Sequence, residues 1–141
     1  MTRHESREHI FKMLFRRDFF EAEEWKEQAE RYLDSLSRQE GEEIADEEKK
    51  ALLDRALAIC EKADALDEEI DRAAEGWKTK RMGKVDLTVL RLALYEMNYD
   101  EDIPTKVAIN EAVEIARKFG GDESPSFVNG VLARLVDRDQ A

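Results

Sequence analysis

The sequence has little cysteine, proline or glycine: one, two and six residues among 141. A lone cysteine, Cys60, excludes an intramolecular disulfide and a cysteine zinc cluster. Because only Pro104 and Pro125 are prolines, long uninterrupted helices can form. No apolar run approaches the roughly 20 residues that a membrane span needs, and the N-terminal MTRHESREHIF lacks the apolar region of a signal peptide. We therefore expect a cytoplasmic protein that does not enter a membrane.

Charge is plentiful but unevenly distributed. The net charge is −11, which by itself argues against nucleic-acid binding. Residues 21–76 hold eight Lys/Arg against twenty Asp/Glu, whereas residues 77–91 hold five against one and residues 1–20 hold five against three. Two short basic segments therefore lie within an acidic chain. From charge alone, solvated helix faces are the favoured interpretation.

Apolar residues recur at helical spacing throughout, which predicts an all-α fold of about six to seven helices. We expect a first helix over 3–20, a second from 23, and a long third over 46–74 with a bend or break near 63–66. A fourth helix should follow an N-cap at Asp86, and a fifth should run from Pro104 to a glycine C-cap at 120. The last helix should follow an N-cap at Ser124. The helix after Asp86 is apolar nearly all round, which predicts a buried central helix. Between two glycines, GWKTKRMGK interrupts the periodicity and predicts a loop.

The last predicted helix contains the stretch PSFVNGVL, in which Asn-Gly is typical of a β-hairpin. The flanking residues lack period-2 alternation, whereas Phe127, Val131 and Leu135 fit a helix. A glycine inside a helix costs about 0.8–1 kcal/mol relative to alanine. We therefore expect Gly130 to permit close packing of a neighbouring helix. Asn129 is either exposed or a buried amide.

No motif predicts catalysis or a cofactor. His4 and His9 are five residues apart, so they do not share a helix face and do not form a metalloprotease pair. Phosphate-binding glycine loops are absent. Glu96 and Glu111 lie in apolar helices and could be partly buried, as the two carboxylates of a catalytic pair would be. For such residues, helix capping or ion pairing is a more common role than catalysis. We expect no catalytic residue, no metal site and no cofactor.

The basic residues remain as candidates for RNA binding. Arg3 and Arg7 are four apart and share a helix face. Trp77 and Phe127 could stack on bases, although such residues more often belong to a core. Further cations cluster before the buried helix and at the end of the next one: Lys78, Lys80, Arg81, Lys84, Arg117 and Lys118.

Three blocks resemble the NusB family of transcription antitermination factors: VLRLALYEM (89–97), IPTKVAINEAVEIARKFG (103–120) and SFVNGVLARL (126–135). Their order and spacing also match, and SREHIFKMLF aligns with that family's first helix. The resemblance implies two small helical bundles, roughly 1–76 and 77–141, in a single RNA-binding domain. It further implies that the protein pairs with the ribosomal protein NusE and binds the boxA element of nascent ribosomal RNA. RNA polymerase in the antitermination complex then reads through terminators.

The resemblance also assigns residues. It places RNA contacts in the first helix, near the start of the buried helix and before the last helix, and partner contacts at two further positions. The implied RNA contacts are Arg3, His4, Arg7, Lys84, Glu123 and Phe127, and the implied partner contacts are Phe15 and Asp86. Together with the basic clusters, this adds Lys80, Arg81, Arg117 and Lys118 as RNA-binding candidates.

The first helix has fewer arginines than well-known members, since Glu5 and Ser6 interrupt the run. The loop at 78–84 could compensate, so we expect weak RNA binding by the chain alone and tighter binding with the partner. A second hypothesis is an interaction adaptor or homodimer that no longer binds RNA. A carboxylate enzyme is a third, remote hypothesis.

Overall fold

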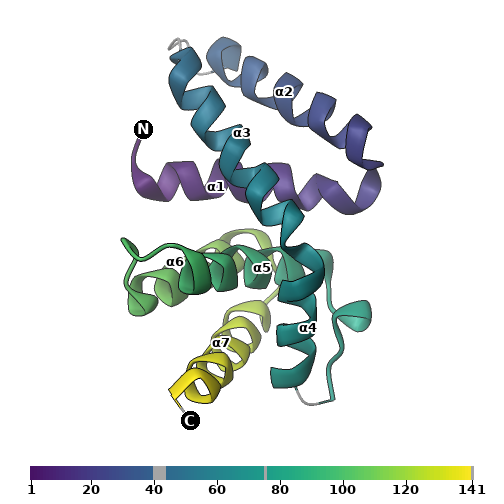
Figure 1. Ribbon diagram of the computed structural model, residues 1–141, viewed down its shortest axis with the longest axis vertical. Helices are drawn as coiled ribbons and strands as arrows, with labels where there is room; N and C mark the ends of the chain where they lie inside the picture. The colour runs from purple at the N-terminus through teal and green to yellow at the C-terminus, as the bar shows by residue number, and fades with distance from the viewer. Residues whose placement is uncertain (40–43, 75, 141) are drawn as a thin grey trace. The chain divides into compact units, whose positions relative to one another are not determined.

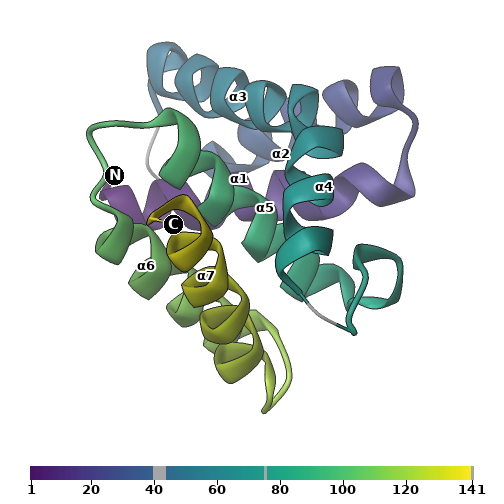
Figure 2. The same ribbon diagram turned by 60° about the horizontal axis from the view of Figure 1, so that its bottom comes forward.

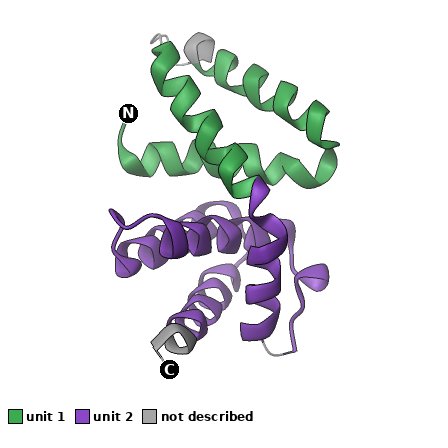
Figure 3. Cartoon of the chain, viewed as in Figure 1, with its two compact units in different colours: residues 1–60 green, residues 61–141 purple. Residues whose placement is uncertain are grey.

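The structure, a computed structural model, describes residues 1–39, 44–74 and 76–140. Over these residues the chain forms seven α-helices, two short 3-10 helices and no strand (Figure 1). This confirms the all-α prediction. No helix in these ranges combines the length and apolar composition that crossing a bilayer requires. The helices form two compact units, Met1–Cys60 and Glu61–Ala141 (Figure 3).

Unit 1 contains α1 (Arg3–Phe15), η1 (Arg16–Phe19), α2 (Ala22–Gln39) and α3 (Asp46–Glu61). The first helix is shorter than the sequence predicts because the chain tightens into a 3-10 turn at Arg16. Two hydrogen bonds join α2 to α1. The buried Trp25 indole N–H donates to the Met13 carbonyl oxygen at 2.7 Å, and the His9 ring Nδ1 lies 2.7 Å from the Tyr32 hydroxyl.

The predicted break in the long third helix is confirmed. α3 ends at Glu61 and α4 (Ala63–Ala73) begins two residues later. Because α4 packs against α5 and α7, it belongs to the C-terminal unit. The boundary between units therefore falls at residues 60/61, whereas the sequence led us to expect it at residues 76/77.

Unit 2 is built around α5 (Lys84–Tyr99). It also contains α4, η2 (Thr79–Arg81), α6 (Thr105–Phe119) and α7 (Ser124–Gln140). Figure 2 shows the other helices of this unit gathered around α5. Val89, Leu90 and Leu94 are completely buried, so the prediction of a central helix is confirmed. Burying each such side chain contributes roughly 1.5–3 kcal/mol, and this apolar packing is the main source of stability in the unit.

A bidentate ion pair lies within this packing. Arg91 Nε and Nη2 on α5 donate to the two carboxylate oxygens of Asp67 on α4, at 2.7 and 2.8 Å. Arg91 is only 8% exposed. One of the five cations in residues 77–91 is therefore internal, and its planar guanidinium fixes the orientation of α4 against α5.

Two predicted helix ends differ in the structure. α5 begins at Lys84 with Gly83 as its N-cap, so the prediction that Asp86 caps this helix is wrong: Asp86 lies inside the first turn. Ser124 is the first residue of α7, and its hydroxyl accepts a hydrogen bond from the Gly121 amide at 3.1 Å. The serine therefore closes the turn between α6 and α7.

The two glycines at positions 120 and 130 have opposite surroundings. Apart from its two chain neighbours and the backbone of its own helix, a Cβ built on Gly130 meets no heavy atom of the described residues within 4 Å, and both Asn129 and Gly130 are exposed. The expectation that Gly130 permits close packing is therefore wrong. At Gly120, the C-cap of α6, a Cβ would lie 2.5 Å from Ser124 Oγ and 2.8 Å from the Ala116 carbonyl oxygen.

We predict that Gly130→Ala raises the free energy of unfolding by about 0.8–1 kcal/mol, because alanine is the better helix former and the site is open. Gly120→Ala should lower it by about 1–3 kcal/mol, because the new methyl group has no room. Urea unfolding of the two variants beside the unmodified chain measures both. A destabilised Gly130→Ala protein would mean that a helix does pack at this glycine.

Candidate nucleic-acid interface

The segment 76–83, which follows α4, has a backbone conformation set by one glycine and several hydrogen bonds. Gly76 has a φ of +79°, a left-handed conformation that glycine adopts without strain. The Trp77 amide donates to the Ala74 carbonyl at 3.0 Å, and the Arg81 amide donates to the Lys78 carbonyl at 2.8 Å. We call this segment the basic loop, since it carries Lys78, Lys80 and Arg81, all exposed.

Asp71 on α4 holds the basic loop in place. Its Oδ1 accepts a hydrogen bond from the Thr79 amide at 2.6 Å, and its Oδ2 accepts one from the Thr79 hydroxyl at 3.3 Å. The Lys78 ammonium donates to the Asp71 carbonyl oxygen at 3.3 Å. Hydrogen bonds to a charged group are among the stronger ones in proteins. The loop is therefore positioned by a carboxylate that itself lies outside the pocket described next.

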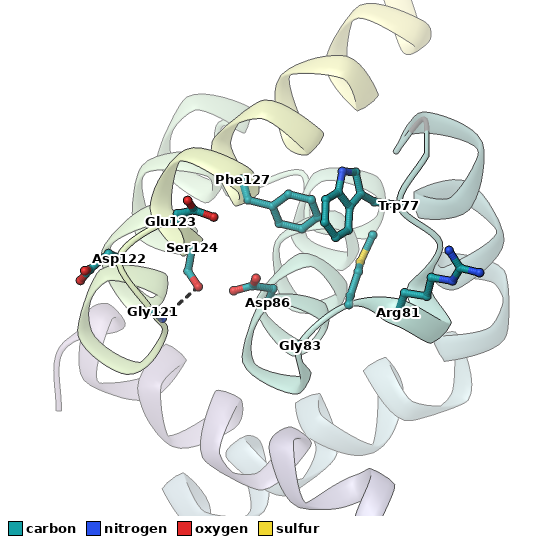
Figure 4. Close-up of a pocket in the computed structure, with 10 residues that line it drawn as sticks. Trp77, Arg81, Gly83, Asp86, Gly121, Asp122, Glu123, Ser124 and Phe127 are labelled. Carbon is teal, nitrogen blue, oxygen red and sulfur yellow. Dashed lines mark hydrogen bonds between the residues drawn. The ribbon is translucent and has the colours of Figure 1, made fainter.

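An open pocket lies between the basic loop, the start of α5 and the turn before α7 (Figure 4). The Trp77 and Phe127 rings meet edge to face there, with centroids 6.0 Å apart and an interplanar angle of 71°. Of the residues predicted as sites, the pocket brings together Arg81, Asp86, Glu123 and Phe127. Its other lining residues are Trp77, Met82, Gly83, Gly121, Asp122 and Ser124.

Charge is divided across this pocket. In Figure 4, Asp122 and Glu123 lie on one side of the aromatic rings and Arg81 lies on the other. The Asp86 carboxylate points toward Ser124, on the acidic side, and its Oδ1 atom is fully buried with no hydrogen-bond partner among the described residues. A buried carboxylate oxygen without a donor is costly. A donor group supplied by a bound molecule would remove that cost.

The remaining predicted cations of this unit do not line the pocket. Lys80 and Lys84 are exposed on and beside the basic loop. Arg117 and Lys118 are exposed in the last turn of α6. Arg117 pairs with Glu114, and the Lys118 ammonium lies 5.3 Å from the centre of the Phe119 ring. These four cations remain predicted RNA contacts.

In unit 1, the predicted residues of α1 differ in exposure. Arg3 is exposed, His4 Nε2 lies 3.6 Å from Glu8 Oε1, and Arg7 is only 7% exposed. Although Arg3 and Arg7 are four residues apart, Arg3 is the one that presents its charge to solvent. Phe15 is half-buried, in ring contact with Phe11 and with the exposed Phe19.

Sequence reasoning missed one feature of this interface and ranked another too low. A core role was the more common expectation for Trp77, yet its side chain is 57% exposed. Its position inside a glycine-bounded basic segment was the available signal. Asp71 carried no signal, because its partner Thr79 comes from a tertiary fold that no local pattern describes. In the part of the chain described, no group of three or more His, Cys, Asp or Glu could hold a metal ion.

Over the described residues, the chain is an all-α protein of two units, one of which carries an open pocket with two aromatic rings beside a basic loop. A model of the NusB family matches residues 4–137. The transcription antitermination protein NusB of Lachnoclostridium phytofermentans is 50% identical over 137 residues, which cover 97% of this chain and 100% of that protein. Its counterpart in Agathobacter rectalis is 51% identical over 136 residues, 96% of this chain and 100% of that protein.

A solved structure agrees with these relatives. NusB of T. maritima is 34% identical, covers 97% of this chain and 92% of its own, and superimposes with a TM-score of 0.84. The chain therefore belongs to the NusB family. The relatives it matches at 50% and 51% identity are transcription antitermination proteins.

We predict that Asp71→Ala frees the basic loop while leaving the helices intact. Hydrogen exchange at the Thr79 amide should accelerate about tenfold or more, because the lost bond involves a charged acceptor worth roughly 1.5–3 kcal/mol. Asp71→Asn keeps an acceptor oxygen and should give an intermediate rate. Asp64→Ala, an exposed position on the same helix, is the matched control. Unchanged protection of Thr79 in Asp71→Ala would show that the carboxylate does not hold the loop.

Proposed function

We propose that this chain is an RNA-binding transcription antitermination factor that binds boxA of nascent ribosomal RNA together with the ribosomal protein NusE. RNA polymerase carrying the assembled complex then reads through terminators. The observation that carries the proposal is the 50% identity to a transcription antitermination protein over nearly the whole chain. The proposed activity is binding in the cytoplasm, with no catalytic step and no cofactor.

The basic loop supports the RNA part of the proposal. Lys80 and Arg81 are exposed and adjacent, and a flexible single strand can follow such cations with its phosphates. Arg3 is the exposed cation of the first helix that supports the same role there. Each unit thus offers at least one exposed cation at a predicted RNA-binding position, in a chain whose net charge is −11.

The buried oxygen of Asp86 supports the partner part of the proposal. A basic side chain or backbone amide of NusE could donate to it, which would exchange an unpaired acceptor for a charge-assisted hydrogen bond. Phe15 and the exposed Phe19 give unit 1 an apolar patch of the kind that protein interfaces cover. A homodimer that uses this patch is the second candidate, and light scattering on the isolated chain distinguishes it from a monomer.

The central test is a fluorescence-anisotropy titration of boxA single-stranded RNA with the chain, with and without NusE, beside a scrambled RNA. We expect weak binding alone, tighter binding with NusE and a preference for boxA. Equal binding of scrambled RNA under both conditions would contradict the proposal.

The double variant Lys80→Ala, Arg81→Ala should weaken binding of all RNA sequences alike. If each cation contacts one phosphate, the slope of log K against log salt should fall by about 1.4, since each contact on a single strand contributes roughly 0.7. Lys26→Ala with Lys50→Ala removes the same charge from exposed positions outside the predicted interface. An equal loss in this control would mean that net charge, and not the basic loop, governs affinity.

Asp86→Asn should weaken NusE binding about tenfold or more, because an amide replaces the buried charged acceptor. RNA binding by the chain alone should not weaken, because the substitution removes a negative charge. Asp122→Asn removes one carboxylate from the rim of the same pocket and serves as the control. Isothermal titration calorimetry with NusE measures both variants. Equal NusE affinity for the two variants and the unmodified chain would exclude a contact at Asp86.

A further inference from the structure

Trp77 is the largest side chain of the basic loop and more than half of it is in contact with solvent. Exposed tryptophan is unusual, because burying so large an apolar surface is favourable. The backbone hydrogen bonds of the loop explain why the Trp77 side chain is exposed. The Trp77 amide is bonded to Ala74, and two residues later Thr79 is held by Asp71, so the loop is anchored on both sides of the indole. The exposure is therefore built into the fold.

The two aromatic rings of the pocket form a corner. Because Trp77 and Phe127 meet at 71° with centroids 6.0 Å apart, a flat group that stacks on one ring meets the other ring at its edge. Met82, which is buried, also lines this space. A corner of this kind fits one planar, unstacked group.

The charges around the corner select what is attached to that planar group. Lys78, Lys80 and Arg81 follow Trp77 directly along the loop. Asp122 and Glu123 lie on the other side of the rings in Figure 4, together with the inward carboxylate of Asp86. An anionic backbone is therefore attracted to the loop side and repelled from the α7 side. A nucleotide has this combination of a flat base and a charged phosphate.

We propose that Trp77 is an RNA contact: it stacks on one unpaired base of a single strand, Phe127 bounds the edge of that base, and Lys78, Lys80 and Arg81 hold the flanking phosphates. This inference rests on the proposed function, which supplies the RNA. Stacking on an aromatic ring tolerates any base, so Trp77 adds affinity without choosing the sequence. The electrostatic attraction of the loop guides the strand to the ring.

The experiment uses the intrinsic fluorescence of the full chain. Of its two tryptophans, Trp25 is 3% exposed and hydrogen-bonded to Met13, whereas Trp77 is accessible. Base stacking quenches indole emission. Titration of boxA single-stranded RNA, alone and with NusE, should quench the unmodified chain with the same midpoint as the anisotropy of labelled RNA. The same titrations of Trp77→Phe subtract any signal from Trp25 or NusE.

Affinity gives the second readout. Trp77→Leu should bind RNA about 5- to 10-fold more weakly, at the low end of the range for losing one stacked base because Phe127 remains. Trp77→Phe should restore most of the affinity, since it keeps an aromatic face. Tyr99→Leu, which changes an exposed aromatic residue of the same unit outside the pocket, should bind within twofold of the unmodified chain. Circular dichroism confirms that each variant is folded.

The outcomes separate the two proposals. If labelled RNA binds but Trp77 is not quenched, or Trp77→Leu binds as the unmodified chain does, this inference is overturned and the proposed function stands. If no RNA binds with or without NusE, the proposed function fails, and with it the base contact. If NusE alone quenches Trp77 and Trp77→Leu loses affinity for NusE only, the corner is a protein-docking site and the inference is overturned.

Discussion

The two-point hydrogen bond between Arg91 and Asp67 is the constraint on which the candidate interface depends. It fixes α4 against α5, and these are the two helices that the basic loop connects. Asp71, one turn further along α4, then holds the loop between them. Breaking a buried ion pair by removing one partner costs several kcal/mol. Without the Arg91–Asp67 pair, α4 and α5 would lose the contact that orients them, and the basic loop connects these two helices. The position of the exposed loop therefore depends on an internal ion pair.

Opposite charges are kept close together throughout unit 2. The basic loop lies beside a turn that carries Asp122 and Glu123, and the acidic chain as a whole would repel a polyanion at long range. At physiological salt, interactions between exposed charges fade beyond about 8 Å, so the nearest cations decide what binds. Local arrangement therefore matters more than the net charge, and a partner protein that adds cations would strengthen RNA binding.

The sequence was most informative where structure is local. Helical periodicity located the helices, the break after α3 and the buried α5, because apolar spacing reports directly on which face is covered. It failed where the outcome depends on contacts between distant residues. Asp86 resembled an N-cap, but the N-cap is Gly83, three residues earlier. Gly130 suggested close packing, but its surroundings are open. The bond from Asp71 to Thr79 is a tertiary feature without a local pattern. The exposure of Trp77 had only one local signal, its place in a glycine-bounded basic segment.

Gly76 has a consequence for how the interface works as a unit. Its left-handed φ sets the direction in which the chain leaves α4, and a side chain at this position would be strained even though space is available. A non-glycine residue here would shift the backbone just before the indole and strain the hydrogen bonds by which Ala74 and Asp71 hold the loop. If the loop binds RNA as proposed, its side chains act through one shared backbone conformation, and the losses from separate substitutions in the loop should not add. The way the loop presents its side chains thus depends on a residue that has no side chain of its own.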